Sequence, residues 1–194
     1  EGQQLDNILW GLHRIKRKAE SQATGMVVLY GDVGTFVTRG SSVGNNLTGN
    51  TYQTDSNVTF KTSNTIGIDI AITSVGGTYS LSYTIDGYLS QSPSVIVETS
   101  SADTTIKQIA DCLVDAVNSQ SSYLYATRNN DNSVKVNIID QSRIGNFSIT
   151  GSATLPRSYM PVYVTSTTYD SQESKVGQVT SIKTPVLGWR GVTN

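Results

Sequence analysis

"GMVVLYGDVGTFVTRGSSVGNNLTGNTYQTDSNVTF", residues 25–60, combines short apolar runs with many glycines, asparagines and threonines. Such a stretch has three interpretations: a ligand-binding loop, a calcium repeat, or the turns of a β structure. It contains neither the phosphate-binding motif G-x-x-x-x-G-K-[ST] nor the dinucleotide-binding motif G-x-G-x-x-G. It also lacks the calcium-binding repeat G-G-x-G-x-D. The sequence therefore supports neither a phosphate, nor a dinucleotide, nor a calcium site in this stretch. The runs at 26–30, 35–38, 51–54 and 57–60 instead predict short strands separated by turns. The first run is continuously apolar, which predicts a strand covered on both faces.

The composition favours a β-rich protein with a polar, weakly charged surface. Charged residues make up 15% of the 194 residues, whereas Ser and Thr together number 49. The charged share of an ordinary domain is about a quarter, and this pattern is typical of extracellular or virion proteins. The formal net charge of −1 argues against nucleic acid as the main partner, because phosphate binding needs clustered cations. No apolar run is long enough to span a membrane.

Residues 5–19 have the apolar spacing of an amphipathic helix. Because the chain starts at Glu1 and ends in "LGWRGVTN", we expect a central piece of a longer protein. We also expect this helix to contact another chain or a preceding region through its apolar stripe. The candidate interaction residues are Leu5, Ile8, Trp10, Leu12, Lys16, Lys18 and Trp189.

Two strands with strict alternation follow the first β segment. In "IGIDIAI", residues 66–72, four isoleucines alternate with Gly67, Asp69 and Ala71. In "TYSLSYTI", residues 78–85, apolar side chains that include Tyr79 and Tyr83 alternate with hydroxyl residues. A period of two predicts one buried and one solvent-exposed face for each strand, with both tyrosines in the core. The "VGG" between the strands, residues 75–77, predicts a hairpin turn.

A second helix is predicted after residue 105. Thr105 and Gln108 have the spacing of a capping box, and an apolar stripe from Ile106 to Val117 follows. A short strand in "SVIVE" precedes the helix, and strands at 123–127 and 134–139 follow it. Segment 63–159 is therefore predicted to be a compact α+β unit, with one antiparallel sheet and one helix across its apolar face. Two further strands are predicted in 162–167 and 176–184.

Side chains for catalysis or metal binding are few. His13 is the sole histidine and lies beside Arg14, where a general base is disfavoured. Cys112 is the sole cysteine and lies off the apolar stripe without a neighbour that would activate it. One cysteine and one histidine cannot make a typical zinc site. Paired carboxylates for glycoside cleavage stay open, because sequence spacing does not fix separation in space. We therefore expect no enzyme, no catalytic residue, no metal and no cofactor.

The two ends of the chain resemble one known family. Residues 2–60 follow the order G-x-x-L-D, a helix ending in Arg and Ala, A-x-G-x-V-x-x-x-G, a glycine–threonine turn, and [YF]-x-T-x-x-x-V-T-[IF]. Residues 173–194 are similar to N-V-x-x-G-x-I-x-x-I-x-T-P-x-x-G-x-x-x-V-x-N. Thr38 stands where the family has a proline. These are the motifs of the baseplate J-like family of contractile phage tails, and they cover about half of the chain.

The resemblance implies a structural wedge protein of a phage or phage-like contractile-tail baseplate. Such a protein links the tail hub to the peripheral tail-fibre parts and is not an enzyme. The implied partners are other baseplate or tail proteins in an oligomeric virion assembly, including contact with a tail fibre. The implied location is the virion tail baseplate, assembled in the host cytoplasm. Nucleic acid is not expected as a partner, and no membrane span is expected.

The predicted fold is α+β and mostly β. A short-stranded β domain with an N-terminal helix is formed by residues 1–62 plus 160–194. It is interrupted by the inserted unit 63–159, which is reasonable because lengthening a loop raises its closure entropy only slowly.

Two other functions stay open at this point. The first is a host-surface or carbohydrate-binding module of a tail protein, which the many hydroxyl, amide and tyrosine side chains favour. The sequence does not decide whether Tyr30, Tyr52, Tyr123 and Tyr125 are exposed. The second, more remote, is a tail-associated cell-wall hydrolase, which the lone histidine and sparse acids disfavour.

Overall fold

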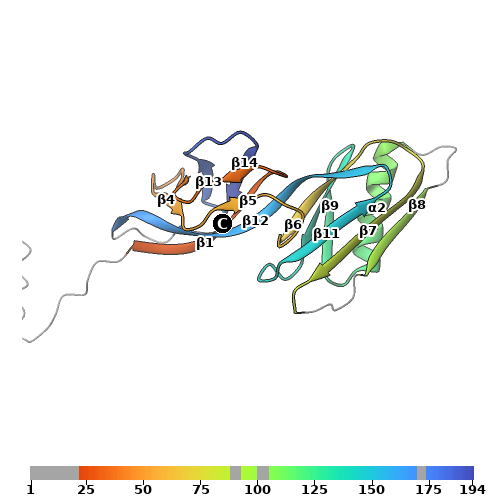
Figure 1. The fold of residues 1–194 in the computed structure, drawn as a ribbon, viewed down its shortest axis with the longest axis horizontal. Coiled ribbons are helices and arrows are strands. Elements are labelled where there is room, and N and C mark those ends of the chain that lie inside the picture. The colour runs from red at the N-terminus through yellow and green to blue at the C-terminus, as the bar shows by residue number, and fades with distance from the viewer. Residues whose placement is uncertain (1–21, 88–92, 100–104, 170–173) are drawn as a thin grey trace, which may run out of the picture.

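The computed structural model describes residues 22–87, 93–99, 105–169 and 174–194, and the helix predicted at 5–19 lies outside them. The described part is mostly β, with several antiparallel sheets and one helix. Figure 1 shows two units next to each other, with strand β12 (Ala153–Tyr169) running from one into the other.

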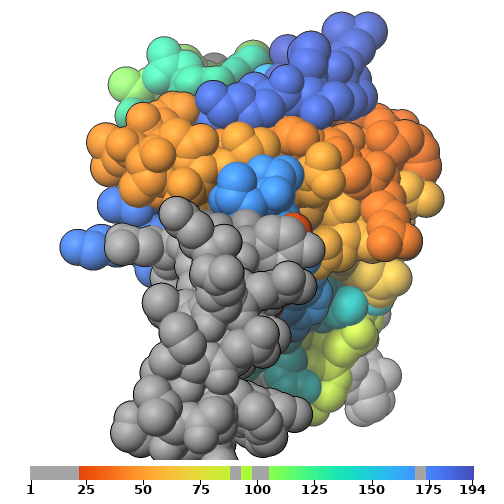
Figure 2. Space-filling view, turned by 90° about the vertical axis from the view of Figure 1, so that its left-hand side faces the viewer, coloured from red at the N-terminus to blue at the C-terminus, as the bar shows by residue number. Residues whose placement is uncertain are grey.

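The first unit joins segments from both ends of the described chain. Besides part of β12 it contains β1 (Gln22–Asp32), β2 (Phe36–Val37), β3 (Ser42–Asn45), β4 (Thr51–Thr54), β5 (Val58–Thr59), β13 (Val179–Ile182) and β14 (Trp189–Thr193). β1 lies between β12 and β14, and β13 pairs with β3, which continues through β4 to β12. Figure 2 shows the dark-blue C-terminal residues lying against the orange N-terminal ones. Strands far apart in the sequence therefore close this unit.

The core of the first unit is built from alternate residues of its strands. Val27 and Leu29 of β1 are buried against Phe60 and Trp189. The prediction that residues 26–30 are covered on both faces is wrong. Met26 is 46% exposed, because only the odd-numbered face of β1 packs on this core.

The second unit contains two sheets and the helix. Its elements are β6 (Gly67–Ile72), β7 (Gly77–Ile85), β8 (Ser94–Thr99), α2 (Ile106–Gln120), β9 (Leu124–Asn130), β10 (Ser133–Ile138) and β11 (Gly145–Thr150). β6, β10 and β9 continue the sheet that contains β12, whereas β11, β7 and β8 form a separate sheet. The two sheets and α2 enclose one hydrophobic core.

The helix forms where the sequence predicted it. Thr105 Oγ1 accepts a hydrogen bond from the Gln108 N–H at 3.2 Å, and Gln108 Oε1 accepts one from the Thr105 N–H at 2.8 Å. These two bonds are the predicted capping box. Ile109 and Leu113 of the apolar stripe are fully buried. Ser121, just beyond the helix, shares a 2.7 Å hydrogen bond with the hydroxyl of Tyr83 on β7, which ties the helix end to the second sheet.

Two predictions about how the strands of the second unit pair are wrong. β6 and β7 do not form a hairpin, since β6 pairs with β10 and β12 while β7 pairs with β8 and β11. The chain passes from one sheet to the other through Gly76 and Gly77, whose φ angles of 87° and 96° favour glycine. The predicted single sheet is therefore two sheets. Their apolar faces, those of Ile68 and Leu81 among others, bury each other across one core.

We predict that Leu113→Ala lowers the free energy of unfolding by about 2–5 kcal/mol, because it leaves a cavity in the second core. Leu113 is fully buried, whereas Leu187 is 97% exposed, so Leu187→Ala is the matched control and is expected to change little. Urea denaturation of both variants measures the difference. Equal effects of the two substitutions would contradict this description of the core.

Candidate functional site

The two units meet where β12 is paired on both sides. Arg157 of β12 lies opposite Asp32 of β1 on one side and opposite Asp69 of β6 on the other. Two residues further along, Tyr159 lies opposite Tyr30 of β1. One short stretch of β12 is therefore hydrogen-bonded to a strand of each unit. We call the side chains gathered here the junction cluster: Tyr30, Asp32, Asp69, Lys135, Arg157, Tyr159 and Arg190.

Within the junction cluster, side chains of alternating charge form a row across four neighbouring strands. The row runs from Asp32 through Arg157 and Asp69 to Lys135, each directly opposite the next. Arg157 Nε lies 3.4 Å from Asp32 Oδ1, and Arg157 Nη1 lies 3.7 Å from Asp69 Oδ2. Opposite charges placed directly across strands stabilise a sheet, whereas like charges would destabilise it. Arg157 thus connects a carboxylate of each unit.

Asp32 is held mainly by Arg190 of β14. Arg190 Nε donates to both carboxylate oxygens, at 3.1 and 3.0 Å, and its Nη2 donates at 2.5 Å. These hydrogen bonds, with the charges of Arg190 and Arg157, lower the pKa of Asp32 despite its partial burial. The same contact raises the pKa of Arg190. Asp32 is therefore a firmly ionised carboxylate at the surface end of the row.

Asp69, in contrast to Asp32, is a buried carboxylate, and the residue is only 1% exposed. The Tyr159 hydroxyl donates a 2.9 Å hydrogen bond to its Oδ1. Burial raises the pKa of Asp69, and this effect outweighs the Tyr159 hydrogen bond and the charges of Arg157 and Lys135. The prediction that the Asp69 side of residues 66–72 faces solvent is wrong. The reason is that Tyr159, Arg157 and Lys135 converge on that side from the neighbouring strands.

Tyr159 is the aromatic centre of the junction cluster. Its ring stacks on Tyr30 with centroids 5.6 Å apart, and Lys135 Nζ lies 4.2 Å from the ring centroid. These are stacking and cation–π contacts. Burial raises the pKa of the Tyr159 hydroxyl and lowers the pKa of Lys135. A Cβ at Gly191 would approach the Tyr30 ring to 2.3 Å, so glycine there allows β14 to pass beside the stacked rings.

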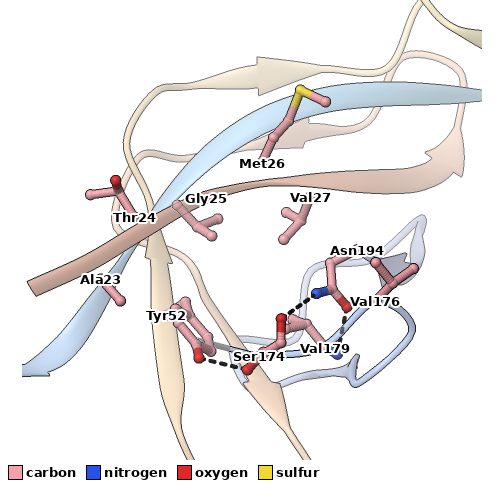
Figure 3. Close-up of a pocket in the computed structure, with 11 residues that line it drawn as sticks. Ala23, Thr24, Gly25, Met26, Val27, Tyr52, Ser174, Val176, Val179 and Asn194 are labelled. Carbon is pink, nitrogen blue, oxygen red and sulfur yellow. Dashed lines mark hydrogen bonds between the residues drawn. The ribbon is translucent and has the colours of Figure 1, made fainter. Parts of the chain in front are cut away.

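A small pocket lies in the first unit at the N-terminal end of β1 (Figure 3). Its volume is about 250 Å³. Its lining residues are uncharged: Ala23, Thr24, Gly25, Met26, Val27, Tyr52, Val164, Ser174, Val176, Val179 and Asn194. The Tyr52 hydroxyl and Ser174 Oγ share a 2.7 Å hydrogen bond, and Asn194 Oδ1 accepts from the Val179 N–H at 2.9 Å. Several polar groups of the wall thus bond to one another.

The residues predicted as interaction sites are only partly within the described chain. Leu5, Ile8, Trp10, Leu12, Lys16 and Lys18 lie outside the described residues. Trp189 is 5% exposed in the core of the first unit, and its indole N–H donates to the Gly191 carbonyl at 2.9 Å. The structure does not bring Trp189 into either the junction cluster or the pocket lining.

The structure shows whether the tyrosines and the cysteine discussed in the sequence analysis are buried or exposed. Tyr79 and Tyr83 are buried in the second core, as predicted. Tyr52 is buried and Tyr125 is 54% exposed. Cys112 is exposed, and His13 lies outside the described residues.

The sequence reasoning missed the junction cluster. One signal was present: in "IGIDIAI" the side opposite the isoleucines carries Gly67 and Ala71 as well as Asp69. A solvent-exposed face rarely consists of small apolar residues around one acid, so a central strand covered on both faces was the better interpretation. The partners of Asp69 come from β10 and β12, and no local pattern identifies them.

The described residues contain no group of three or more His, Cys, Asp or Glu side chains that could hold a metal ion. No helix in the described part of the chain has the length and hydrophobicity to cross a membrane. No protein-family model, curated protein or solved structure matches the chain at significant similarity.

We predict that Tyr159→Phe lowers the free energy of unfolding by about 1–3 kcal/mol, because a buried carboxylate loses a hydrogen-bond donor. The ring, and with it the Tyr30 and Lys135 contacts, is retained. Tyr163→Phe is the matched control, since Tyr163 lies on the same strand but is 66% exposed. Chemical denaturation of both variants near neutral pH measures the difference. A Tyr159→Phe protein as stable as the control would show that the hydroxyl does not support Asp69.

The two carboxylates are predicted to give opposite pH dependences. The pKa of Asp32 is lowered in the fold, so its contribution to stability is present above the unfolded value of about 3.9 and is lost as the pH falls. The pKa of Asp69 is raised, so its ionisation destabilises the fold as the pH rises above about 3.9. Relative to the wild type, Asp32→Asn should therefore become less stable with rising pH and Asp69→Asn more stable. Thermal unfolding between about pH 3 and 7 tests this; parallel curves for the two variants would contradict it.

Proposed function

We propose that the chain is a structural component of the baseplate wedge of a contractile phage tail or phage-like particle. It would act by holding other proteins in place rather than by catalysis. Its partners would be other baseplate or tail proteins in an oligomeric particle, with a tail-fibre protein at the periphery.

The observation that carries this proposal is the closure of the first unit by the two ends of the chain. The resemblance to the baseplate J-like family falls on residues 2–60 and 173–194. The described parts of these segments pair with each other, through β1 with β14 and through β3 with β13. Failure of the ends to share one β unit would have removed the basis of the proposal. Their pairing supports it, because an interrupted domain requires this arrangement.

The rigid attachment of the second unit to the first also supports the proposal. It has a hydrophobic core of its own and is joined to the first unit by the continuous strand β12 and by the junction cluster. A unit attached through a paired sheet and a buried carboxylate keeps a fixed orientation, which a flexible linker would not provide. A fixed orientation suits a wedge that places a peripheral contact at a set position relative to the hub. In this proposal the second unit supplies that contact.

Immunogold electron microscopy tests the proposal. Antibody raised against the purified chain is applied to contractile-tail particles from cells that encode it, with excess free chain as the competing control. We expect label at the baseplate end of the tail before and after sheath contraction. Label confined to fibre tips would instead favour the host-surface binding module, and particles that carry no label would refute a place in the tail.

A further inference from the structure

Helix α2 supplies hydrogen bonds to the terminal strand of each sheet of the second unit. Among the described strands, β9 ends one of these sheets and β8 ends the other. α2 contacts both strands, and Figure 1 shows it between them. Two of its side-chain amides, those of Asn118 and Gln120, bond to the backbones of β9 and β8. These amides take positions that the backbone of a further strand would otherwise occupy.

The amide of Asn118 covers the outer side of β9. The Ala126 N–H donates to Asn118 Oδ1 at 2.8 Å, and Asn118 Nδ2 donates to the Ala126 carbonyl at 3.0 Å. The pairing of β9 with β10 lies on the other side of the strand. Ser121 Oγ also accepts from the Leu124 N–H, at 3.1 Å. Side chains at the end of α2 thus bond to two neighbouring outward-facing positions of β9.

The amide of Gln120 does the same on β8. The Ile96 N–H donates to Gln120 Oε1 at 3.3 Å, and Gln120 Nε2 donates to the Ile96 carbonyl at 3.2 Å. The Pro93 carbonyl, three residues earlier, accepts from the Tyr83 N–H of β7. Backbone groups of successive residues point to alternate sides of a strand, so those of Ile96 point away from β7. One side-chain amide therefore forms both hydrogen bonds that a further strand would form at Ile96.

The residue type and the spacing both suit this role. A side-chain amide carries a donor and an acceptor, as a peptide group does, whereas a lysine lacks the acceptor and an ionised glutamate lacks the donor. Asn118 and Gln120 are two positions apart, which is about 200° around a helix of 3.6 residues per turn. They therefore point to opposite sides of α2, toward the two terminal strands.

The central part of β8 has the composition of a strand that pairs readily with other chains. Val95, Ile96 and Val97 are β-branched, and such residues favour strands. The side chain of Ile96 is 46% exposed. An uncovered edge of this kind is a template for pairing with another chain. A second copy of the same chain carries the same edge, and two identical edges can pair about a two-fold axis.

We propose that Asn118 and Gln120 are edge caps, which keep the terminal strands of the second unit from pairing with those of a second copy of the chain. Each cap saturates the outward-facing backbone groups of one residue, Ala126 on β9 and Ile96 on β8. A strand that approached either edge would have to displace a side-chain amide first. The proposal concerns contacts within the chain and does not depend on the baseplate assignment.

Amide hydrogen exchange at low protein concentration tests the caps in the full chain. The Ile96 and Ala126 amides should be protected in the wild type, although both lie on terminal strands. Gln120→Ala should raise the exchange rate of the Ile96 amide about tenfold, and Asn118→Ala that of the Ala126 amide, each without affecting the other amide. Asp115→Ala is the matched control, because Asp115 is an exposed residue of the same helix, and it should change neither rate.

Sedimentation velocity at equal, higher concentrations tests what the caps prevent. The double variant Asn118→Ala/Gln120→Ala should form larger species than the wild type. Gln120→Glu keeps an acceptor for the Ile96 N–H and adds a charge at the edge, which opposes pairing with an identical edge. Gln120→Glu should therefore associate no more than the wild type and less than Gln120→Ala.

Three outcomes would overturn the proposal. One is exchange at Ile96 and Ala126 that stays as slow in the alanine variants as in the wild type. Another is a double variant that loses protection at both amides and still sediments as the wild type does. The third is faster exchange throughout both sheets in each single variant, since Asn118 and Gln120 would then support the whole fold rather than cap two positions.

Discussion

The double pairing of β12 at Arg157 is the constraint on which the arrangement of the whole molecule depends. The same residue lies opposite β1 of the first unit and β6 of the second. Two units with separate cores would rotate freely about a single connecting chain, but here a turn of one unit against the other would break backbone pairing on at least one side of β12. The side chains of the junction cluster add a second restraint, because Arg157 and Tyr159 contact groups from both units.

The electrostatics of the junction show how position decides the behaviour of a charge. Asp32 and Asp69 lie on either side of Arg157, yet their pKa values shift in opposite directions. Asp32 keeps contact with water and accepts three hydrogen bonds from Arg190. Asp69 loses its hydration, accepts one hydrogen bond from the Tyr159 hydroxyl and has a longer contact with Arg157. A buried charge adds little net stability, but removing its partner is strongly destabilising. Asp69 therefore favours one pairing of β6 with β12, because a slipped register would leave it buried without a partner.

Elements that depend on local signals could be predicted from the sequence. The Thr105–Gln108 capping box and the inward face of β7 follow from spacing alone, and both are present. The distribution of strands between sheets could not be predicted, because the turn at Gly76 and Gly77 suits a hairpin as well as a passage between sheets. The sequence also suggested a strand only at 162–167, while β12 begins at Ala153 and spans both units. Its extra length and the burial of Asp69 depend on partners that are distant in the sequence.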